Sequence, residues 1–190
     1  MPMLLLVAIS IAVIIKTFLV QPFYIPSDSM VPTIIENDRV MVSKLSYQFG
    51  EPQRGDIVVF ISPFNQDIDA ESFGEAVVRH IVESVGIRTA SADDLIKRVV
   101  AVAGDEVSVR DGFLQINGAQ VEEPYLLEQG IMPEFGPVVV PPDSVFVMGD
   151  NRLVSYDSRR FGAISMDRVL GEAVVRIWPP SRFGAVDSRP

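Results

Sequence analysis

The chain contains no cysteine and a single histidine. These two shortages limit the nucleophiles, bases and metal ligands that the protein can use. Without cysteine there is no disulfide framework, no thiolate nucleophile and no cysteine-ligated zinc site. One histidine also excludes a metal site built from clustered histidines. That residue, His80, lies in an apolar stretch over 77–83 without a turn signal, which is typical of a structural or surface histidine. A hydrolase with this sequence is therefore expected to use a base other than histidine.

The chain also lacks a lysine- or arginine-rich tract, and its net charge is −9. Nucleic-acid affinity comes largely from cations that neutralise phosphates, so we expect no nucleic-acid partner. Apolar residues make up 48% of the 190 residues, which excludes a disordered chain. The length suffices for one domain with a core of its own.

An apolar run occupies residues 3–20 and is interrupted only by Ser10, Lys16 and Thr17. Eighteen residues is about the lower limit for spanning a bilayer core of about 30 Å. A buried core helix is an alternative, but a helix that is apolar on all sides is unusual at a chain terminus. A cleaved signal peptide is another, but no basic region precedes the run and no small-x-small site follows it. We expect one transmembrane helix, a retained anchor over 1–21, and a domain over 22–190.

The rest of the chain is rich in β patterns. Alternating or short apolar runs bounded by Gly, Pro and Asn predict strands, and they occupy residues 38–44, 57–61, 95–103, 106–110, 113–116, 138–140, 144–148 and 166–178. Asn117-Gly118 suits a type I′ turn. Residues 62–92 have a weaker pattern, and we interpret them as an insertion over the domain surface. The sequence thus predicts a mostly β, antiparallel domain.

Two serines stand one residue apart, between Pro26 and Pro32, in the stretch 23–33 that follows the apolar run. Each proline fixes its own φ and biases the preceding residue toward extended conformations. We therefore expect a stiff, extended loop that presents the hydroxyls of Ser27 and Ser29. A rigid loop suits a nucleophile, because positioning supplies much of a rate enhancement. The residues alone leave a second interpretation open, a Pro/Ser linker after an anchor.

Two adjacent cations, Lys97 and Arg98, interrupt the apolar run over 95–103. In a strand, one of two neighbouring side chains points inward. Burial disfavours an ammonium and lowers its pKa, which makes an inward lysine a candidate base. An inward arginine keeps its charge and needs a carboxylate partner. A dense polar stretch over 149–159 follows a predicted strand and holds Asp150, Arg152, Ser155, Asp157, Ser158 and Arg159. Paired Asp and Arg residues there suit a loop that keeps one shape beside a site.

Taken in order, these stretches resemble the conserved boxes of bacterial type I signal peptidases. The resemblance covers about residues 5–178 and rests on the apolar segment followed by four boxes: 25–33 (IPSDSMVPT), 54–60 (RGDIVVF), 97–105 (KRVVAVAGD) and 149–159 (GDNR with SYDSR). Four boxes in the right order are far more specific than any one of them. The departures are Asp28 between the two serines, Leu153-Val154 after GDNR, and Arg160-Phe161 before Gly162.

The resemblance implies a Ser-Lys serine protease that needs no metal or cofactor. Ser29 would be the nucleophile and Lys97 the general base, and the backbone N–H of Ser29 with the hydroxyl of Ser27 would form the oxyanion hole. It further implies that Ser155 orients Lys97 and that the supporting pairs are Asp150 with Arg98 and Asp157 with Arg159. The substrate pocket would draw on Ile25, Met30, Val99 and Ala101.

The implied substrates are exported preproteins with small residues at −1 and −3 from the cut. The implied location is the bacterial cytoplasmic membrane, with one span and the catalytic domain outside the cytoplasm. Phe23, Tyr24, Phe49 and Trp178 are candidates for a surface that rests on the bilayer, or for core positions. Two alternatives stay open: a membrane-anchored β domain without activity, and a related self-cleaving Ser-Lys protease, although the 28 residues before Ser29 leave no room for that protein's DNA-binding domain.

Overall fold

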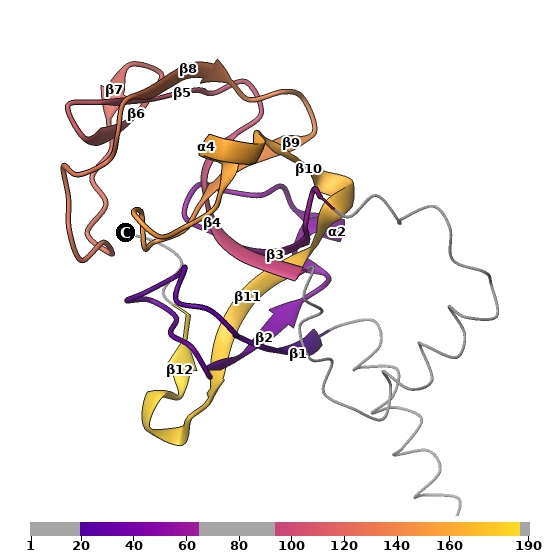
Figure 1. The fold of residues 1–190 in the computed structure, drawn as a ribbon. Helices are drawn as coiled ribbons and strands as arrows, with labels where there is room; N and C mark the ends of the chain where they lie inside the picture. Colours follow the sequence, from indigo (N-terminus) through magenta and orange to yellow (C-terminus); the bar gives the residue numbers. More distant parts are fainter. Residues whose placement is uncertain (1–19, 65–93, 187–190) are drawn as a thin grey trace, which may run out of the picture.

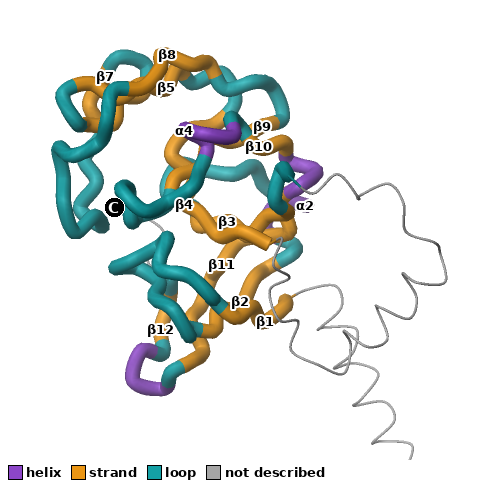
Figure 2. Tube along the Cα trace, in the orientation of Figure 1, coloured by secondary structure: helices purple, strands orange, loops and turns teal. Residues whose placement is uncertain are grey.

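The computed structural model describes residues 20–64 and 94–186 (Figure 1). Strands dominate this part of the chain, with short helical turns between them (Figure 2). The strand pairs are antiparallel, which confirms the predicted mostly β, antiparallel class. Among the described residues, no helix has the length and apolarity needed to cross a membrane. The predicted anchor before Val20, His80 and most of the predicted insertion lie outside the described residues.

In the described part of the chain, the larger sheet has eight strands (Figure 1). Seven of them lie in the spatial order β1 (Val20–Tyr24), β2 (Arg39–Ser43), β11 (Val169–Trp178), β3 (Ile57–Ile61), β4 (Asp94–Val102), β9 (Ser144–Met148) and β10 (Ile164–Ser165). The eighth, β12 (Gly184–Ala185), pairs with β11. The strand β1 therefore forms an edge of the sheet, and β4 lies inside it between β3 and β9.

A second, four-stranded sheet covers one end of the molecule (Figure 1). Its spatial order is β7 (Ala119–Gln120), β6 (Phe113–Ile116), β5 (Glu106–Arg110) and β8 (Phe135–Val139). Asn117 has a positive φ of 54° between β6 and β7, as the predicted Asn-Gly turn requires. The strand expected over 138–140 instead spans Phe135–Val139, because its pairing with Glu106, Val107 and Val109 extends farther toward the N-terminus.

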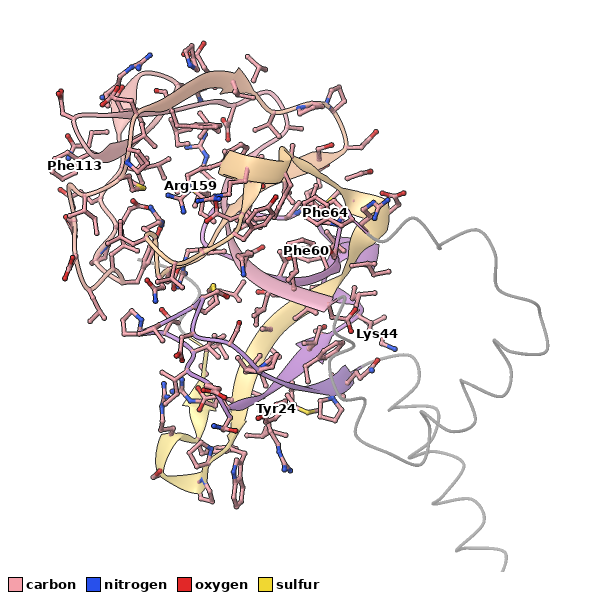
Figure 3. All side chains as sticks on the ribbon, in the orientation of Figure 1. Tyr24, Lys44, Phe60, Phe64, Phe113 and Arg159 are labelled. Carbon is pink, nitrogen blue, oxygen red and sulfur yellow. The ribbon has the colours of Figure 1, made fainter. Side chains whose placement is uncertain are left out.

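Short helical turns connect the strands. They are α2 (Ser46–Phe49), α4 (Ser158–Phe161), η2 (Met166–Arg168) and η3 (Pro180–Arg182). Asp157 caps the N-terminus of α4, because its carboxylate accepts a hydrogen bond from the Arg159 backbone N–H. The helix packs its Phe161 ring against Phe60 and Phe64, whose side chains lie on the same side of the sheet (Figure 3).

Three apolar clusters form the core, and β4 contributes to all of them. Ile96 belongs to a cluster with β1 and β2, Val99 to one with β3 and β9, and Val100 to one under the smaller sheet. Six consecutive residues of β4, from Ile96 to Ala101, are buried. A strand that is covered on both faces buries every side chain, so both Lys97 and Arg98 lie inside the molecule. The prediction that only one of the two side chains points inward was wrong.

The loop over residues 25–33, called the serine loop from here on, is not the extended segment that the sequence predicts. Phe23 and Tyr24 end β1, and the chain turns from Asp28 onward. The Val31 N–H donates to the Asp28 carbonyl at 3.2 Å and the Ile34 N–H to the Met30 carbonyl at 3.0 Å. Prolines restrict only their own φ and the residue before them. Contacts with distant segments fix the backbone path of the other loop residues. The Ser29 carbonyl, for example, accepts a hydrogen bond from the Asn151 N–H at 3.0 Å.

Candidate active site

Ser29 and Lys97 meet in the structure, although 68 residues separate them. The Lys97 Nζ lies 2.8 Å from the Ser29 Oγ. It also donates to the Ile96 carbonyl at 2.8 Å. A distance of 2.6–3.2 Å is what proton transfer between a nucleophile and its base requires. The turn after β1 supplies the serine, and the buried middle of β4 supplies the lysine.

Burial lowers the pKa of Lys97 to about 8, because desolvation disfavours the ammonium. The carboxylates of Asp157 and Asp150 act in the opposite direction and limit the shift. Lys97 is only 3% exposed, so solvent water does not stabilise its ammonium form. The direction agrees with the sequence argument for an inward lysine. Near neutral pH, a fraction of Lys97 is therefore neutral and able to accept a proton.

Ser27 lies beside the same hydroxyl, on the exposed side of the loop. Its Oγ is 3.4 Å from the Ser29 Oγ. Asp28, which departs from the motif, is exposed, and its Oδ1 accepts from the Glu36 N–H at 3.4 Å. The position of the Asp28 carboxylate at the surface leaves it hydrated, which weakens its field on a charge that forms at Ser29.

The predicted pair of Arg98 and Asp150 is present and fully buried. The Arg98 Nε and Nη2 donate to the two carboxylate oxygens of Asp150 at 2.9 and 2.8 Å. The Thr33 hydroxyl donates to the Asp150 Oδ2 at 2.5 Å. A bidentate pair fixes both partners in a plane. Thr33 thereby links the serine loop to Asp150 and, through it, to Arg98, the residue after Lys97. The sequence did not predict this role of Thr33.

The predicted pair of Asp157 and Arg159 is present as well. The Arg159 Nε and Nη2 donate to the Asp157 oxygens at 2.8 Å each. The Asp157 Oδ2 also accepts from the Gly149 N–H at 3.1 Å. Arg159 projects from α4 beside this loop (Figure 3). The pair therefore holds the polar loop over 149–157 to the start of α4.

The predicted contact between Ser155 and Lys97 is not formed in the structure. The Ser155 Oγ is buried and makes no hydrogen bond with any described residue. The physical reason is that Lys97 directs its ammonium to the Ile96 carbonyl and Ser29. Ser155 instead packs on Gly149, where an added Cβ would lie 2.3 Å from its Oγ.

The four predicted pocket residues are buried and belong to three different core clusters. Ile25 and Met30 belong to the first core cluster, Val99 to the third and Ala101 to the second. The strand β4 is irregular between Val99 and Ala101 in its pairing with β9, which turns these two side chains to different clusters. Phe23 is likewise buried in the core, whereas Trp178 is about half exposed.

Glu123 and Tyr125 are site residues that the sequence did not reveal. They lie between β7 and β8, outside every motif, and contact Arg152 and Arg98. The only sequence signal was general: a buried arginine needs a carboxylate. With 25 acidic residues in the chain, that rule does not say which one.

Comparisons with known proteins relate the chain to one family. A family model described as signal peptidase, peptidase S26, matches residues 1–178. Signal peptidase I of Mycobacterium tuberculosis H37Rv is 39% identical over 96% of this chain and 73% of its own length. A probable signal peptidase I-2 of Synechocystis is 39% identical over 93% of this chain and 72% of its own. A crystal structure of a signal peptidase I from Enterococcus faecalis V583 shares 28% identity and a TM-score of 0.47, covering 65% of this chain and 97% of that one.

The β fold and the buried serine–lysine contact fit a class of serine peptidases. The extent of the family match and the identity to these relatives place the protein within that class: the chain belongs to the signal peptidase family, peptidase S26. Its activity is that of a type I signal peptidase, which removes signal peptides from preproteins.

Proposed function

We propose that this signal peptidase cuts its substrates with Ser29 as nucleophile and Lys97 as general base. The observation that carries the proposal is the 2.8 Å separation of the Ser29 Oγ and the Lys97 Nζ, in a site that excludes water from the lysine. No other base is needed, because burial supplies the neutral amine.

The reaction proceeds through an acyl-enzyme. The Ser29 Oγ attacks the scissile carbonyl carbon while its proton moves to the Lys97 Nζ. The Ser29 N–H and the Ser27 hydroxyl stabilise the oxyanion of the tetrahedral intermediate. When the C–N bond breaks, Lys97 gives the proton to the leaving amine. A water molecule then transfers a proton to Lys97 and attacks the ester, and the departing Ser29 oxygen takes the proton back.

The substrates we propose are exported preproteins that carry small residues at −1 and −3. We further propose that the residues before β1 anchor the enzyme once in a bacterial cytoplasmic membrane, with the domain that begins at β1 outside the cytoplasm and 62–92 as an insertion. The boundary expected after residue 21 falls inside β1, which begins at Val20. The apolar run over 3–20 supports the anchor. Carbonate extraction of membranes tests it: the full chain stays in the membrane pellet, and a chain that begins at Val20 loses that behaviour.

The chemical proposal is tested by cleavage of a preprotein with an Ala-x-Ala site in detergent micelles. We expect Ser29→Ala and Lys97→Ala each to abolish cleavage, because either change removes one member of the reacting pair. Lys44→Ala is the control, since Lys44 follows β2 on another part of the sheet (Figure 3) and its loss leaves the rate unchanged. Cleavage by folded Lys97→Ala at the wild-type rate would refute the assignment of the base.

A further inference from the structure

A loop outside the catalytic motifs reaches the two buried arginines beside the site. The loop connects β7 with β8, and two of its residues, Glu123 and Tyr125, make the contacts. Glu123 accepts from the Arg152 Nη1 at 2.7 Å and from its Nη2 at 2.5 Å. Both side chains are almost fully buried. The loop is thereby fixed to the motif that follows β9.

Tyr125 contacts the second buried arginine, Arg98. Its ring lies on the Arg98 guanidinium, 3.9 Å from the ring centroid, a cation–π contact. Its hydroxyl donates to the Glu123 Oε1 at 2.7 Å. Arg98 is thus held in one plane by Asp150 and covered on a face by Tyr125. Since Arg98 directly follows Lys97 in β4, its position constrains the backbone that carries the base.

A second connection runs from Glu123 to the nucleophile. Arg152, held by Glu123, donates through its Nε to the Gly149 carbonyl at 3.1 Å. Gly149 packs so closely on the serine loop that an added Cβ would lie 2.4 Å from the Ser29 carbonyl oxygen. Displacement of Arg152 releases the Gly149 peptide and, with it, the surface on which Ser29 rests.

Charge balance gives Glu123 a further effect. Three arginines in this interior each bind one carboxylate: Arg98 binds Asp150, Arg159 binds Asp157 and Arg152 binds Glu123. Without Glu123, Arg152 keeps its positive charge without this carboxylate partner, in the interior where Asp150 acts on both Arg152 and Lys97. A like charge disfavours an ammonium, so this loss makes Lys97 harder to protonate.

We propose that Glu123 and Tyr125 are positioning residues for catalysis, which hold Lys97 through Arg98 and Ser29 through Arg152 and Gly149. The inference rests on the proposed roles of Ser29 and Lys97. A buried ion pair is weak evidence for stability, since apolar replacements of similar volume are often as stable. We therefore attribute to these contacts a fixed geometry of the site and not a gain in stability.

The first test compares Glu123→Gln with Glu122→Gln, the same chemical change at the exposed neighbouring residue. We measure kcat and KM for an Ala-x-Ala preprotein across pH. Glu123→Gln is expected to lower kcat by up to about 100-fold, as small displacements of reacting groups do, with little change in KM. The rise of kcat with pH, called the pH limb from here on, moves to lower pH in this variant, because Lys97 loses its proton more easily. Glu122→Gln keeps the wild-type kcat and limb.

Tyr125 is tested by two substitutions that separate its ring from its hydroxyl. Tyr125→Phe keeps the ring on Arg98 and retains most of kcat, whereas Tyr125→Leu removes the flat contact and lowers kcat. If Glu123→Gln does not fold, the double variant Glu123→Leu/Arg152→Met removes both charges and is expected to fold. Its pH limb returns to the wild-type position, but kcat stays low because the Gly149 carbonyl has lost its donor.

A wild-type kcat and pH limb in folded Glu123→Gln, or a wild-type kcat in the double variant, would overturn the inference. These outcomes are separable from failure of the proposed dyad. The dyad fails if Lys97→Ala cleaves normally, whereas the positioning role fails if Lys97→Ala is inactive and the Glu123 variants behave as wild type.

Discussion

At the scale of single residues, Lys97 joins local sequence to chemistry. The apolar residues around it in β4 exclude water, and this desolvation lowers its pKa to about 8. The same burial requires a hydrogen-bond partner for the Nζ, and the Ile96 carbonyl and Ser29 provide it. One strand pattern therefore accounts for both the lowered pKa and the direction of the Lys97 amine.

The pH dependence of cleavage follows from this pKa. Only neutral Lys97 accepts the Ser29 proton, so kcat/KM is expected to rise about tenfold per pH unit below a pKa of about 8 and to level off above it. Initial rates on a peptide with an Ala-x-Ala site between pH 5 and 10 provide the measurement. A limb that continues to rise toward pH 10.5, the pKa of a free lysine, would contradict a desolvated base.

Ser27 is expected to contribute through its hydroxyl alone. Its Oγ lies 3.4 Å from the Ser29 Oγ, and Ser27 is exposed. Ser27→Ala should lower kcat by about 10²–10³-fold, as loss of one oxyanion donor does. Ser27→Thr keeps the hydroxyl and should retain most of the rate. Steady-state kinetics of both variants decide the matter, and equal rates for alanine and wild type would remove Ser27 from the oxyanion hole.

At the scale of elements, Gly149 is the point where the loop after β9 meets the serine loop. An added Cβ would lie 2.4 Å from the Ser29 carbonyl oxygen and 2.6 Å from the Ser155 Cβ. These distances are below van der Waals contact, and the Ser29 carbonyl is already held by the Asn151 N–H. Glycine is therefore required here by space, and the two loops approach only because it has no side chain.

Gly149→Ala is expected to push the two loops apart. The strain should cost about 1–3 kcal/mol of the free energy of unfolding and reduce kcat, because Ser29 moves away from Lys97. Gly184→Ala is the matched control, since nothing lies within 4 Å of a Cβ at that position. Chemical denaturation and preprotein cleavage of both variants provide the readouts. Normal cleavage by Gly149→Ala would contradict the close approach.

The strands were largely predictable, and the reasons are local. Continuous apolar runs define β3, β4 and β9, and the Asp111-Gly112 and Asn117-Gly118 turns define the strands of the smaller sheet. The path of the serine loop was not predictable, because Asn151 and Arg176 fix its carbonyl groups from distant parts of the chain. The same holds for Glu123, whose partner Arg152 lies 29 residues away, and for Ser155, whose direction depends on how tightly Gly149 packs.

At the scale of the whole molecule, the buried Lys97 lowers the stability of the folded protein. The unfolded chain keeps the Lys97 proton up to about pH 10.5, whereas the folded chain releases it at about pH 8. Between these values the unfolded state binds more protons, so stability rises with pH. Below pH 8 the full cost is present, and a shift of this size corresponds to about 3 kcal/mol.

Lys97→Met is therefore expected to inactivate the enzyme and to stabilise it by up to about 3 kcal/mol at pH 7. The difference from wild type shrinks as the pH rises from 8 to 10.5, because methionine does not titrate. Denaturant unfolding in detergent at several pH values measures it, with Lys44→Met as the control for the loss of a lysine elsewhere. A difference that does not change with pH would contradict the desolvation cost.

The path along the chain from β1 to Ser29 is short. Nine peptide links separate Val20, the first residue of the edge strand, from Ser29. An extended chain covers at most about 3.6 Å per link, so Ser29 lies within about 30 Å of Val20. Together with the proposed membrane anchor before β1, this stretch would be a tether of fixed length. A preprotein whose cleavage site is held farther from the bilayer by a folded domain then stays uncut, however well its small residues match.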